Sequence, residues 1–587
     1  MTKNKEMISK LFLERSRFVL IGLTGRTGSG CTTAANILES KNPDFPELSS
    51  INYKGESFYS GLNGKRYNIL KNYTAENIDQ FFSIKVSDLI SAYLLCMSKE
   101  HAAKFIASTA ENFVNENDVY NILSKGVFSN NKITVGFKEL ISKLLDHSTN
   151  LNISENEKNK FISFLKLIRK FTNEFKKELK ELNNDLYIST YQGAGNSIRR
   201  LGRVEFNFER NEFSPDNVFH LPETINRVIK IIRKIKHKSL IVIDAIRNPY
   251  EARFFKERYS AFYLVSINAP DEDRKTYLQN VHKYTVDKFD DIEKRESGKT
   301  SIDDADFISQ NVKRCIETSD IHIFNPRNEL DNNNVLKAQL AWYVALMLHP
   351  GLVSPASMER VMQIAYTAKS NSGCISRQVG AVITDNNCSI KAIGWNDVPK
   401  GQIPCSLRSI NGLIHEFDEV TYSQYERNNK EFRKEAKKHL GVIKVVEELG
   451  ELSGRNISYC FKDLKNSFDF KDLKDPKKGN QVHTRSLHAE ENAFLQLTKY
   501  GSAGIEGGKL YTTASPCELC AKKAYQLGIK EIVFIDPYPG IAKEHILSIG
   551  SNPPKLVQFR GAVGKGYHQL YEPTLPYKDE LGYLTNS

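Results

Sequence analysis

The sequence has no apolar run approaching the roughly 18 residues that a membrane-spanning helix needs, so we expect no membrane segment. Charged residues interrupt the first stretch of the chain before any apolar region of the secretory kind, and we therefore expect no signal peptide. Cysteine is scarce, because nine cysteines are scattered through 587 residues without the spacing of a disulfide framework. Such usage is typical of a reducing compartment, and we predict a cytoplasmic protein.

The length and charge of the chain limit its architecture and its partners. A chain of 587 residues exceeds what one hydrophobic core holds, so two or three domains are expected. The hydrophobic content of 40% and the charged content of 26% are ordinary for a globular protein. The net charge of +12 suits polyphosphate ligands, and it permits contact with nucleic acid without requiring it.

The strongest chemical pattern lies near the C-terminal end, where H-A-E at 488–490 is followed by S-P-C-E-L-C at 515–520. One imidazole (His488) and two thiolates (Cys517 and Cys520) leave one tetrahedral position of a zinc ion open for water. Glu490 is not needed as a ligand and is able to carry protons. The pattern resembles the signature of zinc-dependent nucleobase deaminases. The alternative is a structural zinc knuckle, which normally has a fourth protein ligand and leaves Glu490 without a role.

The surrounding sequence predicts how these residues are held. Helical spacing at 487–498 and at 516–527 predicts two helices, with a strand at 509–513 between them. His488 and Glu490 fall in the first turn of one helix, and both cysteines fall near the N-terminus of the other. The helix dipole favours thiolate over thiol at that position. We therefore expect the zinc ion to lie between two helix N-termini.

A second pattern lies near the N-terminus, where an apolar run at 18–23 precedes G-R-T-G-S-G-C-T-T and a helical segment at 34–39. Strand, glycine-rich turn and helix form the context of a phosphate-binding P-loop, in which Thr32 is a candidate ligand of Mg²⁺. Cys31 replaces the lysine that reaches the β- and γ-phosphates, which argues against phosphoryl transfer more than against nucleotide binding. Arg26 is a candidate source of the missing charge. A glycine-rich turn that binds nothing is the alternative.

Further strands support a nucleotide-binding half. The strand predicted at 239–243 ends in Asp244, the expected Mg²⁺-side partner of a P-loop, and more strands are predicted at 261–267 and 321–324. With the P-loop, the stretch D-A-I-R-N-P-Y-E-A-R-F-F resembles nucleoside and deoxynucleoside monophosphate kinases. The resemblance implies a kinase-like domain with a parallel sheet and a bound nucleotide (ATP, GTP or a dNTP). The candidate nucleotide-binding residues are Gly25, Arg26, Gly28, Ser29, Gly30, Cys31, Thr32, Thr33 and Asp244.

We place this domain at residues 1–330 and its linker at about 326–336. A helical insertion is expected at about 84–185, with one apolar face and many lysines. The lysines favour a solvated face over an RNA site. After the insertion, Arg199 or Arg200 is a candidate contact for a nucleotide phosphate.

The C-terminal half has a second predicted order of elements. A helix at 357–370 and strands at 379–384 and 389–394 precede the motif helices, and a strand at 531–535 follows them. This order implies an α/β/α sandwich. The segments S-N-S-G-C-I-S-R-Q-V-G-A-V-I, G-W-N-D-V-P, H-A-E-E-N-A and T-A-S-P-C-E-L-C-A-K-K resemble the deoxycytidylate deaminase family.

That resemblance implies roles for four more residues. Asn396 is expected to bond the sugar 3′-hydroxyl, Arg377 and nearby basic groups to contact phosphate, Ala489 to line the cytosine pocket, and Tyr538 to cover the substrate. The deaminase domain is expected over 337–587, with an insertion at about 405–480 that simpler family members lack. Around the insertion lie Cys374, Cys405, Cys460 and His483. They are either a second zinc site or, as we favour, free residues.

The combination of the two halves resembles the bacterial anti-phage deoxycytidine-nucleotide deaminases. This resemblance implies conversion of dCTP and dCMP to deoxyuridine nucleotides, which depletes the dCTP pool during infection. It also implies regulation through the P-loop domain and, for some members, inhibition by a small RNA. A homo-oligomer is expected.

Three other functions are open. One is a housekeeping dCMP deaminase of dTMP biosynthesis. Another is a deaminase of bases within RNA or single-stranded DNA, which predicts aromatic stacking platforms and strong salt dependence. Asn396 and the kinase-like partner domain favour small nucleotides over nucleic acid. The third is a nucleotide sensor with a silent deaminase, which would need a broken zinc site, although all four motif residues are present.

Overall fold

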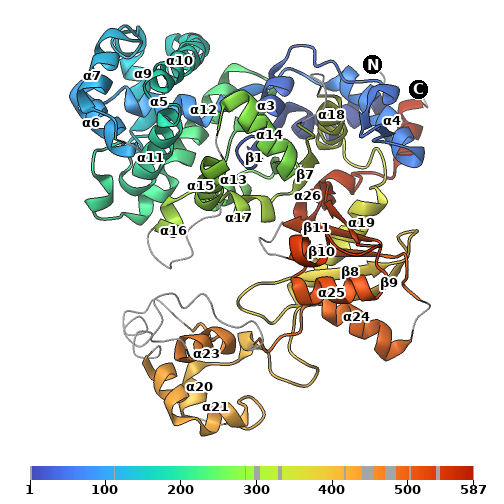
Figure 1. Cartoon of the computed structure of the whole chain (residues 1–587). Coiled ribbons are helices and arrows are strands. Elements are labelled where there is room, and N and C mark those ends of the chain that lie inside the picture. The colour runs from blue at the N-terminus through green and yellow to red at the C-terminus, as the bar shows by residue number, and fades with distance from the viewer. Residues whose placement is uncertain are drawn as a thin grey trace. The chain divides into compact units, whose positions relative to one another are not determined.

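The chain divides into two compact units, shown in Figure 1. One unit comprises residues 1–354 with 565–587, and the other comprises residues 355–564. The computed structural model describes residues 3–110, 113–284, 286–296, 305–327, 333–415, 418–438, 454–469, 484–501, 504–536 and 542–585. Within these ranges, each helix is too short or too polar to cross a membrane.

The first unit is built on parallel strands. They follow one another across the sheet in the order β7-β6-β1-β5-β4, and each is parallel to its neighbour. The bounds are β1 Phe18–Thr24, β4 Phe82–Lys85, β5 Ser239–Asp244, β6 Phe262–Asn268 and β7 Ile321–Phe324. β1, β5 and β6 are buried along their whole length, as expected for apolar strands with helices on both faces. The three predicted strands and the apolar run at 18–23 are confirmed to within one residue, whereas the short β4 was not predicted.

Helices fill the connections of this sheet. The glycine-rich loop leads into α3 (Cys31–Glu39), which begins earlier than the expected residue 34. The predicted helical insertion is confirmed and packs as a subdomain on the core (Figure 1). Its helices, with the neighbouring α4, are α4 Gly61–Asn77, α5 Val86–Leu94, α6 Lys99–Thr109, α7 Glu116–Lys125, α9 Lys138–Leu145, α10 Glu155–Leu182, α11 Leu186–Leu201 and α12 His220–Ile235. The later helices are α13 Pro249–Arg258, α14 Asp271–His282, α15 Val286–Glu296 and α17 Val312–Glu317.

The long helix α10 explains the periodicity of the insertion. Its start is fixed by a capping box. The Ser154 hydroxyl accepts a hydrogen bond from the Glu157 N–H, and the Glu157 carboxylate accepts one from the Ser154 N–H. Its apolar face, including Phe161, Phe164 and Ile168, is fully buried in the subdomain core. Helix α10 is therefore amphipathic: one apolar stripe is buried, and lysines lie on the rest of its surface.

The first unit ends later than the sequence suggested. Helix α18 (Asn334–Leu348) is buried around its whole circumference and packs on α4 and β7, so residues 337–348 belong to this unit and not to the deaminase domain in which the sequence places them. The chain also returns to this unit at its C-terminal end through α26 (Gly564–Tyr571) and α27 (Tyr577–Thr585). Buried His349 pairs with Glu580 at 2.8 Å, and Trp342 donates to the Tyr571 hydroxyl at 3.2 Å. The division at 354 and 565 thus replaces the expected boundary at 330–337.

The second unit is a three-layer α/β/α sandwich. Its strands β8 Gly380–Thr384, β9 Ile390–Trp395, β10 Lys509–Ala514, β11 Glu531–Asp536 and β12 Lys555–Gln558 lie in the order β12-β11-β10-β8-β9. The β8–β9 hairpin and the β8–β10 pair are antiparallel, and β10, β11 and β12 are parallel. Side chains alternate between the faces: one face packs on α19 (Ser357–Ala368), and the other packs on α24 (Ala489–Tyr500) and α25 (Glu518–Gln526). The predicted strands are confirmed to within one residue.

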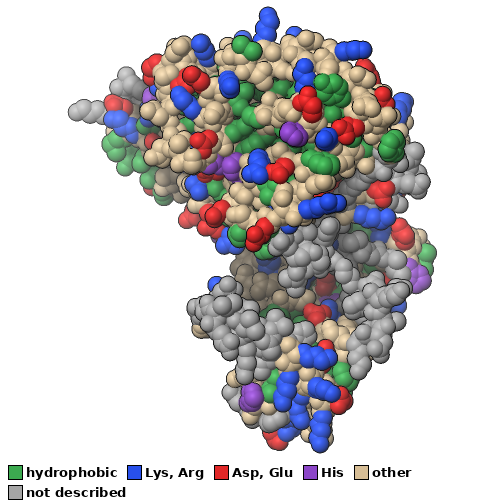
Figure 2. Space-filling model, turned by 90° about the vertical axis from the view of Figure 1, so that its left-hand side faces the viewer, with side chains coloured by type: hydrophobic (Ala, Val, Ile, Leu, Met, Phe, Trp, Pro, Cys, Tyr) green, Lys and Arg blue, Asp and Glu red, His purple; other side chains and the backbone are tan. Residues whose placement is uncertain are grey.

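The described part of the insertion forms a small core of its own. It contains α20 (Ile410–His415), α21 (Gln424–Asn428) and α23 (Phe461–Asp469). Lys and Arg side chains gather on the end of the molecule that carries these helices (Figure 2). Within the insertion, Lys430, Lys434, Lys437 and Lys438 are exposed.

Candidate functional site

Three candidate metal ligands converge at the N-termini of two helices in the second unit. His488 is the N-cap of α24, Cys517 is the N-cap of α25, and Cys520 lies in the first turn of α25. His488 Nδ1 lies 3.2 Å from Cys517 Sγ and 3.5 Å from Cys520 Sγ. Nitrogen and sulfur ligands of one tetrahedral zinc ion are separated by roughly 3.5 Å. The geometry therefore fits zinc, and in the described part of the chain it is the one cluster of this kind.

The expected helix starts differ slightly from the observed ones. Pro516 was expected in the first turn of the cysteine helix, but Cys517 still has extended backbone (φ −71°, ψ 172°), so α25 begins at Glu518. His488 likewise has extended backbone and precedes α24. Both ligands are thus placed at helix caps, where the positive end of the helix dipole faces the thiolates.

The electrostatics of the three side chains favour a bound cation. The hydrogen bond with Cys520, together with that of His488, lowers the pKa of Cys517 to about 3. The same sulfur pairing and burial raise the pKa of Cys520, because the two thiols share one proton. The Cys517 hydrogen bond also raises the pKa of His488. A divalent cation replaces the shared protons when it binds such a set.

Glu490 lies in the first turn of α24, beside this cluster. It is 4% exposed, and burial raises its pKa. Its Oε1 accepts a hydrogen bond of 3.1 Å from the hydroxyl of Thr512, a buried residue of β10. A carboxyl with a raised pKa is suited to hold and release a proton near neutral pH. Thr512 was not singled out in the sequence, because only the fold brings β10 against α24.

A pocket of about 620 Å³ opens over these residues. Ala489 and Asn396 lie in its wall, as expected. The Asn396 side chain holds the neighbouring loop, because Oδ1 accepts from the Val379 N–H at 2.7 Å and Nδ2 donates to the Arg377 carbonyl at 2.6 Å. Each of the two amide atoms retains capacity for one more hydrogen bond, so a contact with a sugar hydroxyl is compatible with this position.

The basic groups of the pocket differ in their pairing. Arg377 donates to buried Asp536 at 2.5 Å, which neutralises much of its charge. Arg485 and Lys462 also line the pocket and were not singled out in the sequence. Tyr538 lies outside the described residues, so its expected place over the substrate is not addressed by the structure.

The suggested second zinc site gains no support from the described residues. Cys374, Cys405 and Cys460 line the same pocket, but they do not form a metal-binding group with any described side chain. His483 lies outside the described ranges. Burial raises the pKa of Cys460 to about 11, as expected for a neutral thiol.

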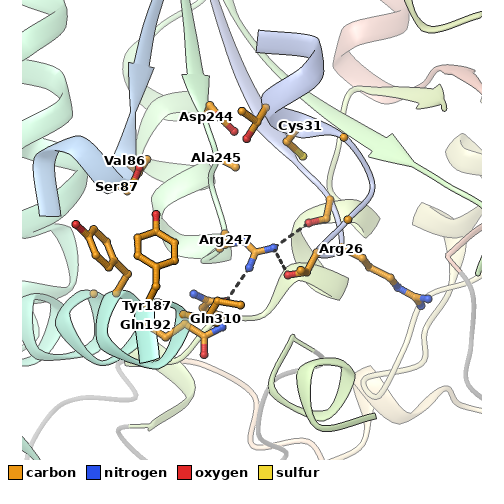
Figure 3. A pocket seen from close by; sticks show the side chains of 18 of the residues that line it. Arg26, Cys31, Val86, Ser87, Tyr187, Gln192, Asp244, Ala245, Arg247 and Gln310 are labelled. Carbon is orange, nitrogen blue, oxygen red and sulfur yellow. Dashed lines mark hydrogen bonds between the residues drawn. The ribbon is translucent and has the colours of Figure 1, made fainter. Parts of the chain in front are cut away.

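The first unit has a cavity of about 600 Å³ at its glycine-rich loop, shown in Figure 3. Gly28 (φ +86°) and Gly30 (φ +109°) require glycine, and a Cβ on Gly30 would lie 2.2 Å from Asn325 Nδ2. All the candidate nucleotide-binding residues except Ser29 line the cavity. Opposite the loop, Val86, Ser87, Tyr187 and Gln192 border the same space (Figure 3).

Cys31 and Asp244 face the cavity from the side of the glycine-rich loop (Figure 3). Burial and the nearby Asp244 raise the pKa of Cys31 to about 12, so the thiol stays neutral and supplies no positive charge. Burial also raises the pKa of Asp244, whereas a hydrogen bond with Thr32 opposes that rise. The structure thus brings together the hydroxyl and the carboxylate that the sequence assigned to Mg²⁺.

The arginines around the glycine-rich loop are largely paired with acids. Arg26 pairs with Asp271 at 3.0 Å and extends away from Cys31 (Figure 3), so its charge does not replace the missing lysine. Arg247 ties the loop together by donating to the Gly25 carbonyl, the Thr27 hydroxyl, Gln310 and Glu296.

The two arginines of α11 also have protein partners. Arg199 is buried against Glu251 at 2.8 Å, and Arg200 donates to the Asn211 carbonyl. Lys176 and Lys180 of the helical insertion line the cavity, although the sequence favoured a solvated face for them.

Comparison with known proteins identifies the second unit. The profile described as "Cytidine and deoxycytidylate deaminase zinc-binding region" matches residues 355–536, which include His488, Glu490 and both cysteines. The deoxycytidylate deaminase of Enterobacteria phage T2 is 30% identical over 190 residues, covering 30% of this chain and 79% of the phage protein. That of Enterobacteria phage T4 is 30% identical over 178 residues, covering 30% and 77%.

Two further proteins are similar to this chain. The deoxycytidylate deaminase of Schizosaccharomyces pombe is 26% identical over 308 residues, covering 51% of this chain and 71% of the yeast protein. The crystal structure of dCMP deaminase from the cyanophage S-TIM5, in complex with dCMP and dUMP, has 20% identity and a TM-score of 0.18. It covers 34% of this chain and 93% of that one. From the profile and the phage relatives, the chain belongs to the cytidine and deoxycytidylate deaminase family.

Proposed function

We propose that the second unit hydrolyses the 4-amino group of free deoxycytidine nucleotides. The reaction converts cytosine and water to uracil and ammonia. The observation that carries this proposal is the convergence of His488, Cys517 and Cys520 with buried Glu490 at the floor of one pocket. The relatives' names, deoxycytidylate deaminase, support dCMP as a substrate.

Each residue of the site has a separate role in this reaction. His488, Cys517 and Cys520 would hold zinc, which supplies Lewis acidity that lowers the pKa of a bound water. Glu490 takes one proton from the attacking water and delivers it to the cytosine ring nitrogen; it then takes the second proton, from the hydroxyl added at C4, and delivers it to the amino group, which leaves as ammonia. Thr512 keeps the Glu490 carboxylate in place during both transfers. Ala489 forms the small wall against which the base lies.

We extend the proposal to dCTP and to a role in depleting the dCTP pool during phage infection. The fusion to a P-loop unit supports this extension, because regulation by a nucleotide suits an enzyme that destroys a replication precursor. An inhibitory small RNA and a homo-oligomer belong to the same proposal.

For the first unit, we propose that it binds a nucleotide without transferring phosphate. The cavity is large enough for a small-molecule ligand, and its P-loop carries the Thr32–Asp244 pair suited to Mg²⁺. Cys31 lacks the charge that phosphoryl transfer uses. Incubation with ATP and dCMP therefore leaves dCMP unphosphorylated, and robust formation of dCDP would contradict this proposal.

The test of the main proposal uses the purified chain with dCTP, dCMP, CTP and a cytosine-containing oligonucleotide in separate reactions. Uracil products are followed by chromatography, with and without a zinc chelator. Chelator-sensitive conversion of dCTP supports the nucleotide-pool role, and conversion of dCMP alone supports a biosynthetic dCMP deaminase instead. Conversion of the oligonucleotide alone would replace the proposal with nucleic-acid deamination.

A further inference from the structure

The glycine-rich loop of the first unit already binds an anionic group of its own chain. Glu296, the last residue of α15, is 3% exposed. Its Oε1 and Oε2 accept hydrogen bonds from the Thr27 N–H at 3.0 and 3.2 Å, and its Oε1 also accepts one from the Thr27 hydroxyl. Arg247 Nη2 donates to the same Oε1 at 2.9 Å. A buried carboxylate is thus bound by the backbone and side chains of the loop.

The donors that hold Glu296 are of the kind that bind phosphate. Backbone N–H groups of a glycine-rich loop, a hydroxyl and a guanidinium make charge-assisted hydrogen bonds with carboxylate and phosphate oxygens alike. Thr27 and Arg247 line the adjacent cavity themselves, and Arg247 extends into it (Figure 3). Cys31 and Thr32 also line it, and in the first turn of α3 their N–H groups have no intrahelical acceptor. The loop therefore offers a helix N-terminus to a ligand, while Glu296 occupies a neighbouring anion position.

Acids of α14 and α15 also engage two further guanidinium groups at the loop. Glu293 binds Arg274, and Asp271 pairs with Arg26 at 3.0 Å and with Arg274 at 3.2 Å. Arg274 is fully buried, and its Nη1 donates to the Thr27 carbonyl at 3.3 Å. Thr27 is therefore held through its N–H by α15 and through its carbonyl by α14. A phosphate chain on this side of the loop meets donors that acidic side chains already occupy.

We propose that Glu296 is an internal competitor for the phosphate chain of the nucleotide that binds the first unit. A polyphosphate ligand binds with its terminal phosphate in place of the Glu296 carboxylate, which then leaves the Thr27 N–H and Arg247. The exchange favours ligands whose charged oxygens replace all of these hydrogen bonds, so a nucleoside triphosphate is favoured over a monophosphate. This proposal rests on the proposed nucleotide binding by the first unit, and it names the ligand class and the residue that limits its affinity.

The test measures ligand affinity by titration calorimetry on the full chain with Mg²⁺. The ligands are ATP, which carries no cytosine for the deaminase unit, and inorganic triphosphate, which has neither base nor sugar. We expect Glu296→Gln to bind both about 10- to 100-fold more tightly than wild type, because a neutral amide competes less well for Thr27 and Arg247. The matched control is Glu257→Gln, which changes an exposed glutamate of α13 that pairs with Arg253 and should leave both affinities unchanged.

The outcomes separate this proposal from nucleotide binding itself. If wild type binds ATP and Glu296→Gln binds it equally or more weakly, Glu296 is not a competitor, and nucleotide binding by the first unit stands. If Glu296→Gln binds triphosphate more tightly than wild type but neither chain binds ATP, nucleotide binding is wrong and the competitor is supported. If neither chain binds either ligand, both proposals are wrong.

A second readout uses wild type alone and does not depend on how well a variant folds. Once displaced, Glu296 no longer anchors α15, so saturating ATP should accelerate amide hydrogen exchange in residues 286–296 while it slows exchange in the loop at 25–33. A ligand that binds without displacing Glu296 would slow exchange in both segments or leave residues 286–296 unchanged. Either of these patterns in the ATP-bound protein would overturn the proposal.

Discussion

Glu490 combines burial, a raised pKa and a single hydroxyl donor. Replacing it by Gln keeps the shape of the side chain but removes its ability to exchange protons. We predict that Glu490→Gln lowers kcat for dCMP about 100- to 10,000-fold, the usual contribution of a general acid–base group. Zinc content should remain one ion per chain, since His488 and the two cysteines are unchanged. Turnover near the wild-type rate would contradict the role of Glu490, and loss of zinc would show that it supports the metal site instead.

Cys31 yields a prediction about pH. Because burial raises its pKa to about 12, its thiolate fraction at pH 8 is about one in 10,000, compared with roughly one in four for a free thiol of pKa about 8.5. We predict that iodoacetamide alkylates Cys31 very slowly in the folded protein at pH 8, and that the rate rises about tenfold per pH unit toward pH 12 while the fold persists. Peptide mass spectrometry measures this, with urea-unfolded protein as the control. Rapid labelling of folded protein at pH 8 would show an accessible thiolate at the P-loop.

The candidate ligands were found in the sequence because their chemistry is local. His488 and Glu490 share one motif, and Cys517 and Cys520 share another, so spacing alone shows that they form one set. Thr512, which donates a hydrogen bond to Glu490, was missed. Its contact depends on the fold, because Thr512 meets Glu490 only where β10 packs on α24. No spacing rule contains that information.

The insertion core depends on a buried network of three side chains. Arg408 and Glu426 are both fully buried, and the Tyr459 hydroxyl donates to Glu426 at 2.5 Å. Glu426→Ala leaves the Arg408 charge buried without its carboxylate, and we predict a loss of about 3–5 kcal/mol in the stability of this subdomain. Hydrogen exchange of α20 and α23 measures it. Tyr459→Phe keeps both charges and should cost only about 1 kcal/mol. If the amides of α20 and α23 exchange equally slowly in wild type and Glu426→Ala, the network does not stabilise the subdomain.

How well a strand or helix could be predicted from the sequence depends on its length and composition. Long apolar strands such as β1 and β5 are buried on both faces, so continuous runs of Val, Ile and Leu reveal them. β4 is a strand of only four residues that passes directly into α5, and helical periodicity hides its start. The sequence places α26 and α27 in the deaminase domain, because their few apolar residues do not indicate which core they join.

The deaminase unit is joined to the first unit by two connections, one at each of its ends. The chain leaves the first unit at Ser354 and re-enters it at Lys565, so the deaminase is an insertion between α18 and α26. The Gly351 N–H donates to the Leu570 carbonyl at 3.0 Å and joins the two connections within the first unit. Both connections to the deaminase unit therefore start from one packed part of the first unit.

This arrangement predicts which fragment of the chain folds alone. Residues 355–564 contain the sandwich with both of its helical layers, and we expect this fragment to bind zinc and to deaminate dCMP within about tenfold of the full chain. Residues 337–587, the domain expected from the sequence, would carry most of α18 together with α26 and α27 but without α4 and β7. Their apolar surfaces, among them Trp342 and Leu570, would then be exposed. We predict that this longer fragment aggregates, because exposed apolar patches of that kind associate. Size-exclusion chromatography, zinc content and dCMP turnover distinguish the two fragments, and a monodisperse longer fragment beside an insoluble shorter one would place α18 and the C-terminal helices with the deaminase.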